Sequence, residues 1–205
     1  MTDIRPSEKM FNMRAFLTIL ILLFSIQSWS KADDIRDFEI EGISIGDSLL
    51  KFGNKDKIDS IKSSQQYKSK YTIYDIEKLI NVKNYDYMSL TTKNNDKEYI
   101  VTSVSGVINY NELDNCLQKQ KKIAAEVEKL LNYDEKEEKI YPSQRDKTGN
   151  SKIHTIVFYF KPYPSQEAIS INCSHFTIES NIQRTLKVGA SSEEFANFLI
   201  NEAYK

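Results

Sequence analysis

The stretch NELDNCLQKQKKIAAEVEKLL, residues 111–131, decides the fold of this chain. Its apolar side chains recur at steps of three and four, which is the spacing of one face of an α-helix. Gln120 is the one polar residue on this face, Asn111 can cap the first turn, and Asp114 places a negative charge in that turn. We predict one long amphipathic helix that packs on a sheet.

Residues on the N-terminal side of this helix predict a helical hairpin followed by three strands. Asp47 or Ser44 can cap a short helix that ends at Gly53, and Asn54 can cap a second helix over 55–63. The next segments are rich in tyrosine, threonine, valine and isoleucine, which favour β-structure. We expect antiparallel strands over 70–76, 85–92 and 99–109, with a turn at 94–97.

Residues on the C-terminal side predict a second antiparallel group and a last helix. The charged segment 134–150 is broken by Pro142, so we expect an exposed connection in which 139–141 could add an edge strand. Ser191 and Glu194 form a capping box at the start of an amphipathic helix. Strands are expected over 152–161, 167–176 and 182–188.

The fold class that follows is α+β, with a helical hairpin, two antiparallel groups, a long helix packed on sheet and a C-terminal helix. We expect residues 33–205 to form a single domain, with 33–110 and 111–205 as its candidate sub-units. The two groups of strands either share one sheet under the long helix or form two small stacked units. The pattern leaves both arrangements open.

The first residues have the order of a secretory signal. Basic residues precede an apolar run over 15–24, which is too short for a membrane span of about 20 residues. Residues 30–32, Ser-Lys-Ala, have the small-x-small form that signal peptidase reads. We predict a signal peptide over 1–32, a mature start at Asp33, and a periplasmic or secreted protein. The alternative is an uncleaved segment, which would then be the one attachment to a membrane.

Composition limits the function classes. The 205 residues are 40% hydrophobic and 28% charged, a balance that is typical of a globular chain rather than a disordered one. Lys and Arg number 28 and Asp and Glu number 29, which gives a net charge of −1. A balanced charge gives no reason to expect binding to nucleic acid.

The two cysteines predict a disulfide. Cys116 lies on the apolar face of the long helix, and Cys173 alternates with Ile169 and Ile171 in a strand. Both thiols should then point into the interface between helix and sheet. An even number of cysteines in an exported protein favours a bridge, so we expect one that joins the two halves of the chain.

The two histidines are the candidates for chemistry. If the turn at 162–165 closes a hairpin, His154 lies opposite residues 173–175 and close to His175. A metal ion would need at least one more ligand, and no Asp or Glu at a suitable spacing lies nearby in the sequence. The chain also lacks motifs such as His-Glu-x-x-His and Gly-x-Ser-x-Gly. We therefore expect no catalytic, cofactor-binding or metal-binding residue, and no cofactor.

Tyrosines and carboxylates offer two weaker signals. Seven tyrosines between Tyr67 and Tyr110 could form an aromatic face for sugar or peptide, although tyrosine is also a common strand residue. No pair of carboxylates surrounds a recognisable cleft motif. We expect the carboxylates at 75–77, 86, 96 and 135–138 to be solvated surface charges.

Residues 33–50, DDIRDFEIEGISIGDSLL, carry a resemblance. They resemble the mature start of a set of uncharacterised small exported proteins of marine alphaproteobacteria, which implies export and brings no activity. More loosely, Gly42-Ile43-Ser44 before two short helices and three strands is similar to the outer-membrane assembly lipoprotein BamE and to beta-lactamase-inhibitor-like modules. The lipid-bearing cysteine of that lipoprotein is missing. This second likeness covers at most residues 38–110 and implies a binding module.

Together these observations favour an exported binding or interaction module without catalysis, whose partner is an envelope protein or a small ligand. Two alternatives stay open. One is a small envelope hydrolase that uses His154 or His175 with a carboxylate in a pocket. The other is a carrier of a small apolar ligand between the long helix and the sheet.

Overall fold

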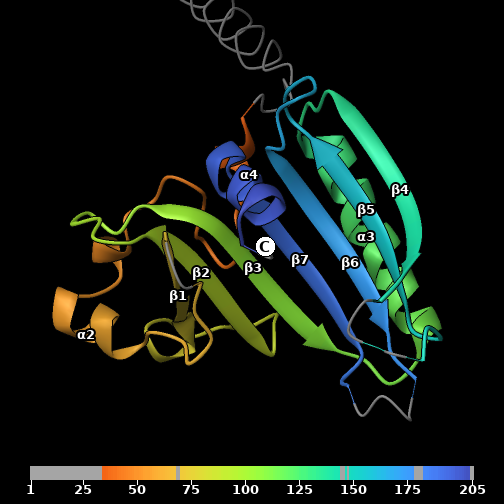
Figure 1. Ribbon diagram of the computed structural model, residues 1–205, viewed down its shortest axis with the longest axis horizontal. Helices are drawn as coiled ribbons and strands as arrows, with labels where there is room; N and C mark the ends of the chain where they lie inside the picture. Colours follow the sequence, from red (N-terminus) through yellow and green to blue (C-terminus); the bar gives the residue numbers. More distant parts are fainter. Residues whose placement is uncertain (1–33, 68–69, 144–145, 147, 178–181, 204–205) are drawn as a thin grey trace, which may run out of the picture. The chain divides into compact units, whose positions relative to one another are not determined.

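Seven strands form one antiparallel sheet in the computed structural model, which describes residues 34–67, 70–143, 146, 148–177 and 182–203. The strand order is β1-β2-β3-β7-β6-β5-β4 (Figure 1). The strands are β1 (Tyr71–Asp75), β2 (Tyr87–Lys93), β3 (Val101–Asn109), β4 (Glu135–Pro142), β5 (Lys152–Tyr159), β6 (Ala168–His175) and β7 (Thr185–Ser191). The described helices are α2 (Lys55–Ser60), α3 (Leu113–Leu130) and α4 (Glu193–Asn201), with 3-10 turns η1 (Ile35–Asp37), η2 (Leu49–Lys51) and η3 (Ile76–Lys78). The predicted α+β class is confirmed.

The last strand in the sequence, β7, lies in the middle of the sheet and joins its two halves. Its residues 185–191 pair with 103–109 of β3 on one side, and 185–191 pair with 168–174 of β6 on the other. β3 ends the first predicted group of strands, and β7 is the last strand of the second. The two groups therefore share one sheet, which decides between the two arrangements that the sequence leaves open.

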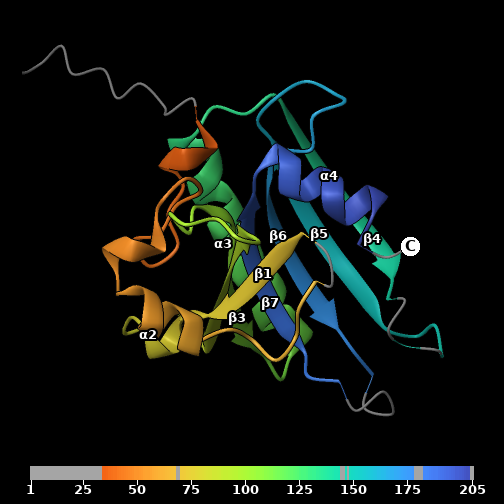
Figure 2. The same cartoon turned by 60° about the vertical axis from the view of Figure 1, so that its left-hand side comes forward.

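The two faces of the sheet differ in character, because successive side chains of a strand alternate between them. On β6, Ile169, Ile171 and Cys173 are fully buried and point toward α3, on what we call the back face. Ser170 and Asn172 point to the opposite, front face, where they are only partly buried. Figures 1 and 2 show α3 on one face of the sheet and α4 on the other.

A continuous hydrophobic core fills the back of the sheet. Ala124 and Val127 of α3 pack against β5, β6 and β7, while Ile43, Leu49 and Ile58 from the N-terminal segment belong to the same cluster as the back residues of β2 and β3. This core spans both halves of the sheet. Its size is consistent with burial as the main source of the folding free energy.

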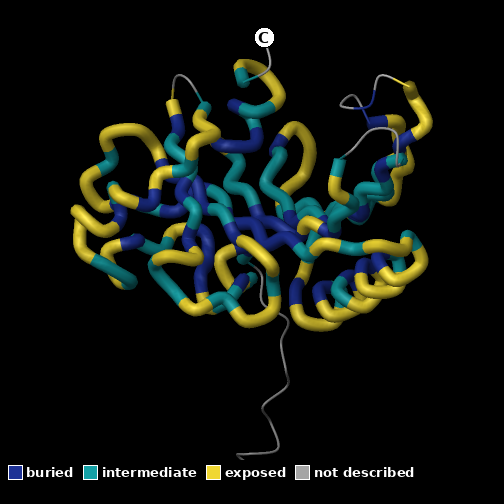
Figure 3. Tube along the Cα trace, turned by 90° about the horizontal axis from the view of Figure 1, so that it is seen from below, coloured by how far each residue is buried: buried dark blue, intermediate teal, exposed yellow. Residues whose placement is uncertain are grey.

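Helix α4 covers one end of the front face. Phe195 and Phe198 pack against Tyr71 of β1, with ring centroids 5.0 and 4.8 Å apart. An ion pair of 2.6 Å between Lys93 and Glu194 adds a contact from β2. Figure 3 shows the C-terminal helix rising from one side of the layer of buried residues that forms the sheet.

The predicted helical hairpin is smaller than expected. Its first element is only the 3-10 turn η2, and Ser48 caps it rather than Asp47 or Ser44. Asp47 instead closes the preceding turn, because its Oδ2 accepts a hydrogen bond of 2.9 Å from the Ser44 amide. Asn54 caps α2 as predicted, since its side chain accepts from the Lys57 amide at 3.0 Å.

Both later helices begin beyond their predicted caps. Glu112 is the N-cap residue of α3 without a side-chain hydrogen bond, and the Asn111 carbonyl oxygen accepts one of 2.6 Å from Arg184 Nη1. Ser192 caps α4, and Ser191 remains the last residue of β7. The predicted capping box is therefore wrong. The first residue of that box, Ser191, pairs with the neighbouring strands as part of β7.

Residues 134–150 hold a longer edge strand than the segment 139–141 that the sequence allows within an exposed connection. They contain the complete edge strand β4, which pairs with β5 from Glu135↔Tyr159 to Pro142↔Lys152. Most side chains of β4 are exposed, so the strand has no apolar alternation by which it could be recognised. Its pairing partner, rather than its own sequence pattern, determines its structure.

No helix of the described part of the chain combines the length and the apolar character that a membrane span requires. The predicted signal peptide over 1–32 lies outside the described residues. Its cleavage stays a prediction.

Candidate functional site

The predicted disulfide is present between α3 and β6. Cys116 and Cys173 are bonded and buried on the back face, with Cα atoms 6.0 Å apart, which is an ordinary separation. One turn further along α3, Gln120 donates from Nε2 to the carbonyl oxygens of His154 at 2.8 Å and Ile171 at 2.6 Å. These bonds explain the one polar residue on the apolar face, because a buried amide needs partners.

The two histidines lie on the back face beside the disulfide, as the predicted hairpin implies. His154 is opposite Cys173, and His175 is opposite Lys152. Burial lowers the pKa of His154, and the charges of His175 and Lys152 lower it further. Within the described ranges, no group of three or more His, Cys, Asp or Glu side chains is arranged to hold a metal ion. The imidazoles are thus brought together without a third ligand.

The tyrosines between 67 and 110 do not form one aromatic face. Tyr74 and Tyr99 pack on each other in the back core, with ring centroids 6.3 Å apart. Tyr71 instead packs under α4, on the other side of the sheet. The ring of Tyr85 fills the space beside Gly106, where a Cβ atom would lie 2.4 Å from Cδ1 of the ring. These tyrosines serve the packing of the fold.

The carboxylates singled out in the sequence organise turns and strand ends. The Asn109 amide donates to Asp86 Oδ2 at 2.6 Å, and the Ile100 amide donates to Asp96 Oδ2 at 2.8 Å. Glu137 and Glu138 form ion pairs with Lys139 and Lys136 of the same strand. This group therefore has structural partners and does not converge on one point.

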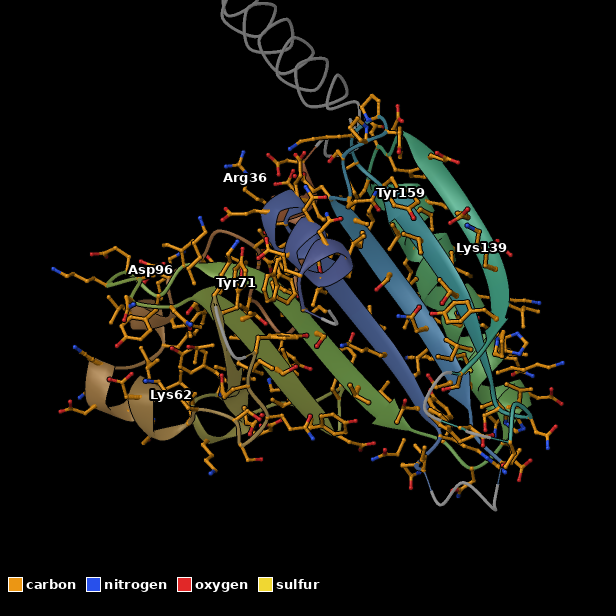
Figure 4. The ribbon with its side chains drawn as sticks, in the orientation of Figure 1. Arg36, Lys62, Tyr71, Asp96, Lys139 and Tyr159 are labelled. Carbon is orange, nitrogen blue, oxygen red and sulfur yellow. A yellow bond between two sulfur atoms is a disulfide. The ribbon has the colours of Figure 1, made fainter. Side chains whose placement is uncertain are left out.

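The front face of the central strands is a candidate site that sequence reasoning missed. Figure 4 shows this side of the sheet, with Tyr71 beside α4 and with Tyr159 and Lys139 toward the β4 edge. The alternation and register of the strands set a group of polar or small residues together there. This group, which we call the polar face, consists of Ser105, Thr155, Ser170, Asn172, Lys187 and Gly189.

Hydrogen bonds order the hydroxyl and amide groups of the polar face. Thr155 Oγ1 donates to Asn172 Oδ1 at 2.6 Å, and Asn172 Nδ2 donates to Ser170 Oγ at 3.5 Å. The Tyr141 hydroxyl lies 3.4 Å from Thr155 Oγ1 and continues this row onto β4. Donors and acceptors that are already positioned can bind a polar ligand with little loss of side-chain entropy.

Gly189 is the position in the polar face where two neighbouring strands come close together. Gly189 lies between Ser105 of β3 and Ser170 of β6. A Cβ atom at Gly189 would lie 3.1 Å from both Ser105 Cβ and the Val104 carbonyl oxygen, so even alanine would be crowded. The backbones of β3 and β7 therefore approach each other closely at this point, and Gly189 itself is buried.

Lys187 lies on β7 at the end of the polar row that begins with Thr155, between Val107 of β3 and Asn172 of β6. The surrounding strands displace water, and this desolvation lowers the pKa of the ammonium group. Lys187 is nevertheless exposed to solvent, which limits the size of that effect. No ion pair joins it to any Asp or Glu that the structure describes. The polar face thus holds a partly desolvated cation without a protein counter-charge.

The sequence carries one signal for this site. In β7, Leu186 and Val188 are buried and enclose Lys187, so the alternation places the lysine away from the core. That pattern does not reveal that β7 is the central strand. The neighbours of Lys187 become known only from the pairing of β7 with β3 and β6.

Comparisons with protein-family models, with curated proteins and with solved structures found no match.

Proposed function

We propose that this chain is an exported binding module without catalysis, and that its polar face binds a small anionic ligand through Lys187. The position of Lys187 carries the proposal. A charge that loses part of its hydration without gaining a partner is unfavourable, and an anion would compensate for that loss. If the face had only a structural role, an uncharged side chain could stand at position 187, because the neighbours Ser170 and Asn172 are themselves uncharged.

The neighbours of Lys187 indicate the chemistry of the ligand. Thr155, Ser170 and Asn172 offer hydroxyl and amide groups on the same face as the ammonium group. The Ser170 hydroxyl and the second amide hydrogen of Asn172 can donate to carboxylate or phosphate oxygens, while the Thr155 hydroxyl orients Asn172, and a charged partner strengthens such bonds. The expected ligand is a small polar molecule that bears a carboxylate or a phosphate.

Export is supported by the signal-like order of residues 1–32 and by the disulfide, because disulfides persist in oxidising compartments. We propose a periplasmic or secreted location on this basis. Fractionation with N-terminal sequencing should find a mature start at or next to Asp33. Full-length protein in the cytoplasm would overturn export and would leave anion binding untouched.

The two alternative functions gain no specific support. A hydrolase would need a carboxylate that acts on His154. The pKa of His154 is instead lowered by burial and by the charges of His175 and Lys152. For a carrier, a groove of about 220 Å³ lies between Phe38 and α3. That volume is below the ~300–1,000 Å³ of typical ligand pockets.

A titration followed by NMR tests the proposed site. The ¹⁵N-labelled protein is titrated with inorganic phosphate and, separately, with acetate. We expect saturable shifts of the backbone amide signals of 170–172 and 187. Lys187→Gln should abolish them, whereas Lys119→Gln, at an exposed position of α3, should leave them unchanged.

Two results would count against the site. The first is that neither anion gives a saturable shift on the front face of the wild-type protein. The second is that Lys187→Gln binds both anions as well as the wild type does. Equal loss in Lys119→Gln would indicate a general charge effect rather than a site. The two probes also show whether the site favours phosphate or carboxylate.

A further inference from the structure

The two edges of the sheet differ in whether the chain covers them. On the outer side of β1, the Ser63 amide donates to the Ile73 oxygen at 2.9 Å, and the Asp75 amide donates to the Ile61 oxygen at 2.9 Å. At the other edge, β4 pairs with β5, and no further strand of the described residues lies beside it. An uncovered edge strand is a template for pairing with another chain.

Strand β4 is long and regular for an uncovered edge. It has 8 residues and pairs with β5 without a break in register. Natural proteins commonly blunt free edges with short strands, bulges, charges or proline. β4 has charges and a terminal Pro142, but near that end Ile140 and Tyr141 leave 64% and 43% of their surfaces exposed. The order of the charges therefore decides which partner this edge accepts.

The charges of β4 complement themselves when the strand is turned end to end. In an antiparallel pair of two β4 strands centred on Glu137, Glu135 faces Lys139 of the second copy, and Lys136 faces Glu138 of the second copy. Opposite charges directly across a pair of strands are stabilising. The two Glu137 side chains face each other, and each has Lys139 of its own strand as an ion-pair partner.

We propose that a second copy of this chain is the partner of the β4 edge, so that two copies pair antiparallel into one continuous sheet. The two-fold axis passes midway between the two Glu137 residues, and each copy contributes the same surface. An axis perpendicular to the sheet places both polar faces on the same side of the dimer. The inference does not depend on ligand binding.

Cysteine cross-linking tests the register. Both native cysteines are bonded to each other, so an introduced cysteine is the only free thiol. Glu137→Cys should give a covalent dimer on mild oxidation, because residue 137 faces its own counterpart. Glu135→Cys is the matched control on the same face and should cross-link only after it is mixed with Lys139→Cys. Equal cross-linking of Glu135→Cys and Glu137→Cys alone would overturn the register.

Charge reversal tests the interface by sedimentation velocity. Glu135→Lys and Lys139→Glu each create two like-charge pairs across the axis, so each variant alone should dimerise roughly tenfold more weakly. Mixed together, the two variants restore both opposite-charge pairs and should form a heterodimer. Lys122→Glu, at an exposed position of α3, should dimerise like the wild type.

Three results would overturn the proposal: a wild-type protein that stays monomeric up to millimolar concentration, a dimer that ignores both reversals, or a mixture that dimerises no better than either variant alone. Pairing of β4 with a foreign peptide in preference to a second copy would also overturn it. A dimer that forms normally but binds neither phosphate nor acetate would leave this inference intact and count only against the proposed ligand site.

Discussion

Gly106 has no side chain, and this leaves space for the ring of Tyr85 to pack against strand β3. The ring of Tyr85 lies where a Cβ atom of residue 106 would be, 2.4 Å from Cδ1. Gly106→Ala must move the ring or the strand, and we expect it to lower the free energy of unfolding by about 1–3 kcal/mol. Denaturant unfolding measures this loss. With Tyr85→Leu already in place the alanine should cost less, and equal costs in both backgrounds would contradict the explanation.

Asp146 links the stability of the fold to pH. Its carboxylate accepts hydrogen bonds from the amide and hydroxyl of Thr148 at 2.9 Å each and from Ser151, and these bonds lower its pKa to about 2. A pKa lowered by folding adds stability that is present above the unfolded value, near 3.8, and is lost as the pH falls toward 2.

The expected result is a stability difference between wild type and Asp146→Asn that shrinks as the pH falls from about 4 to about 2. Chemical unfolding at a series of pH values measures it. Glu126→Gln, which removes an exposed carboxylate on α3, is the control for general charge effects. A difference that stays constant across this window would show that the ionised carboxylate of Asp146 does not hold the turn.

At the scale of elements, Gln120 fastens α3 to two strands at once. Its amide donates to carbonyl oxygens of β5 and β6 from a buried position. Gln120→Leu removes both hydrogen bonds, and we expect a loss of about 1–3 kcal/mol in the free energy of unfolding. Gln118→Leu, at an exposed position of the same helix, should change it by no more than about 0.5 kcal/mol. Similar losses for both would point to helix propensity instead.

Elements with a local pattern could be predicted from the sequence, and elements that depend on a partner could not. The apolar face of 111–131 predicts α3, and the alternation around Cys173 predicts both β6 and the direction of its thiol. β4 has no such alternation, so only β5 defines it. The surroundings of Lys187 depend on strand order, which joins residues far apart in the sequence. The candidate site was therefore beyond local patterns.

For the whole molecule, the central place of β7 makes the C-terminal segment essential. A chain that ends at residue 183 lacks β7 and leaves β3 and β6 without their common partner. We expect it to show no cooperative unfolding transition in circular dichroism. A chain that ends at Ser192 keeps β7 and loses α4 with its contacts to Tyr71, so it should fold with lower stability. Cooperative unfolding of the shorter chain would show that the halves fold separately.

The place of β7 also sets when the molecule can become complete. Ribosomes make the chain from its N-terminus, yet the middle of the sheet comes from residues 185–191, which follow the other six strands in the sequence. Until these residues leave the ribosome or a translocation channel, β3 and β6 each keep an open edge, and the long-range contacts that close the sheet cannot form. The sheet of such a chain stays open until its seventh strand has been made, which is compatible with the proposed export of the chain in an unfolded state.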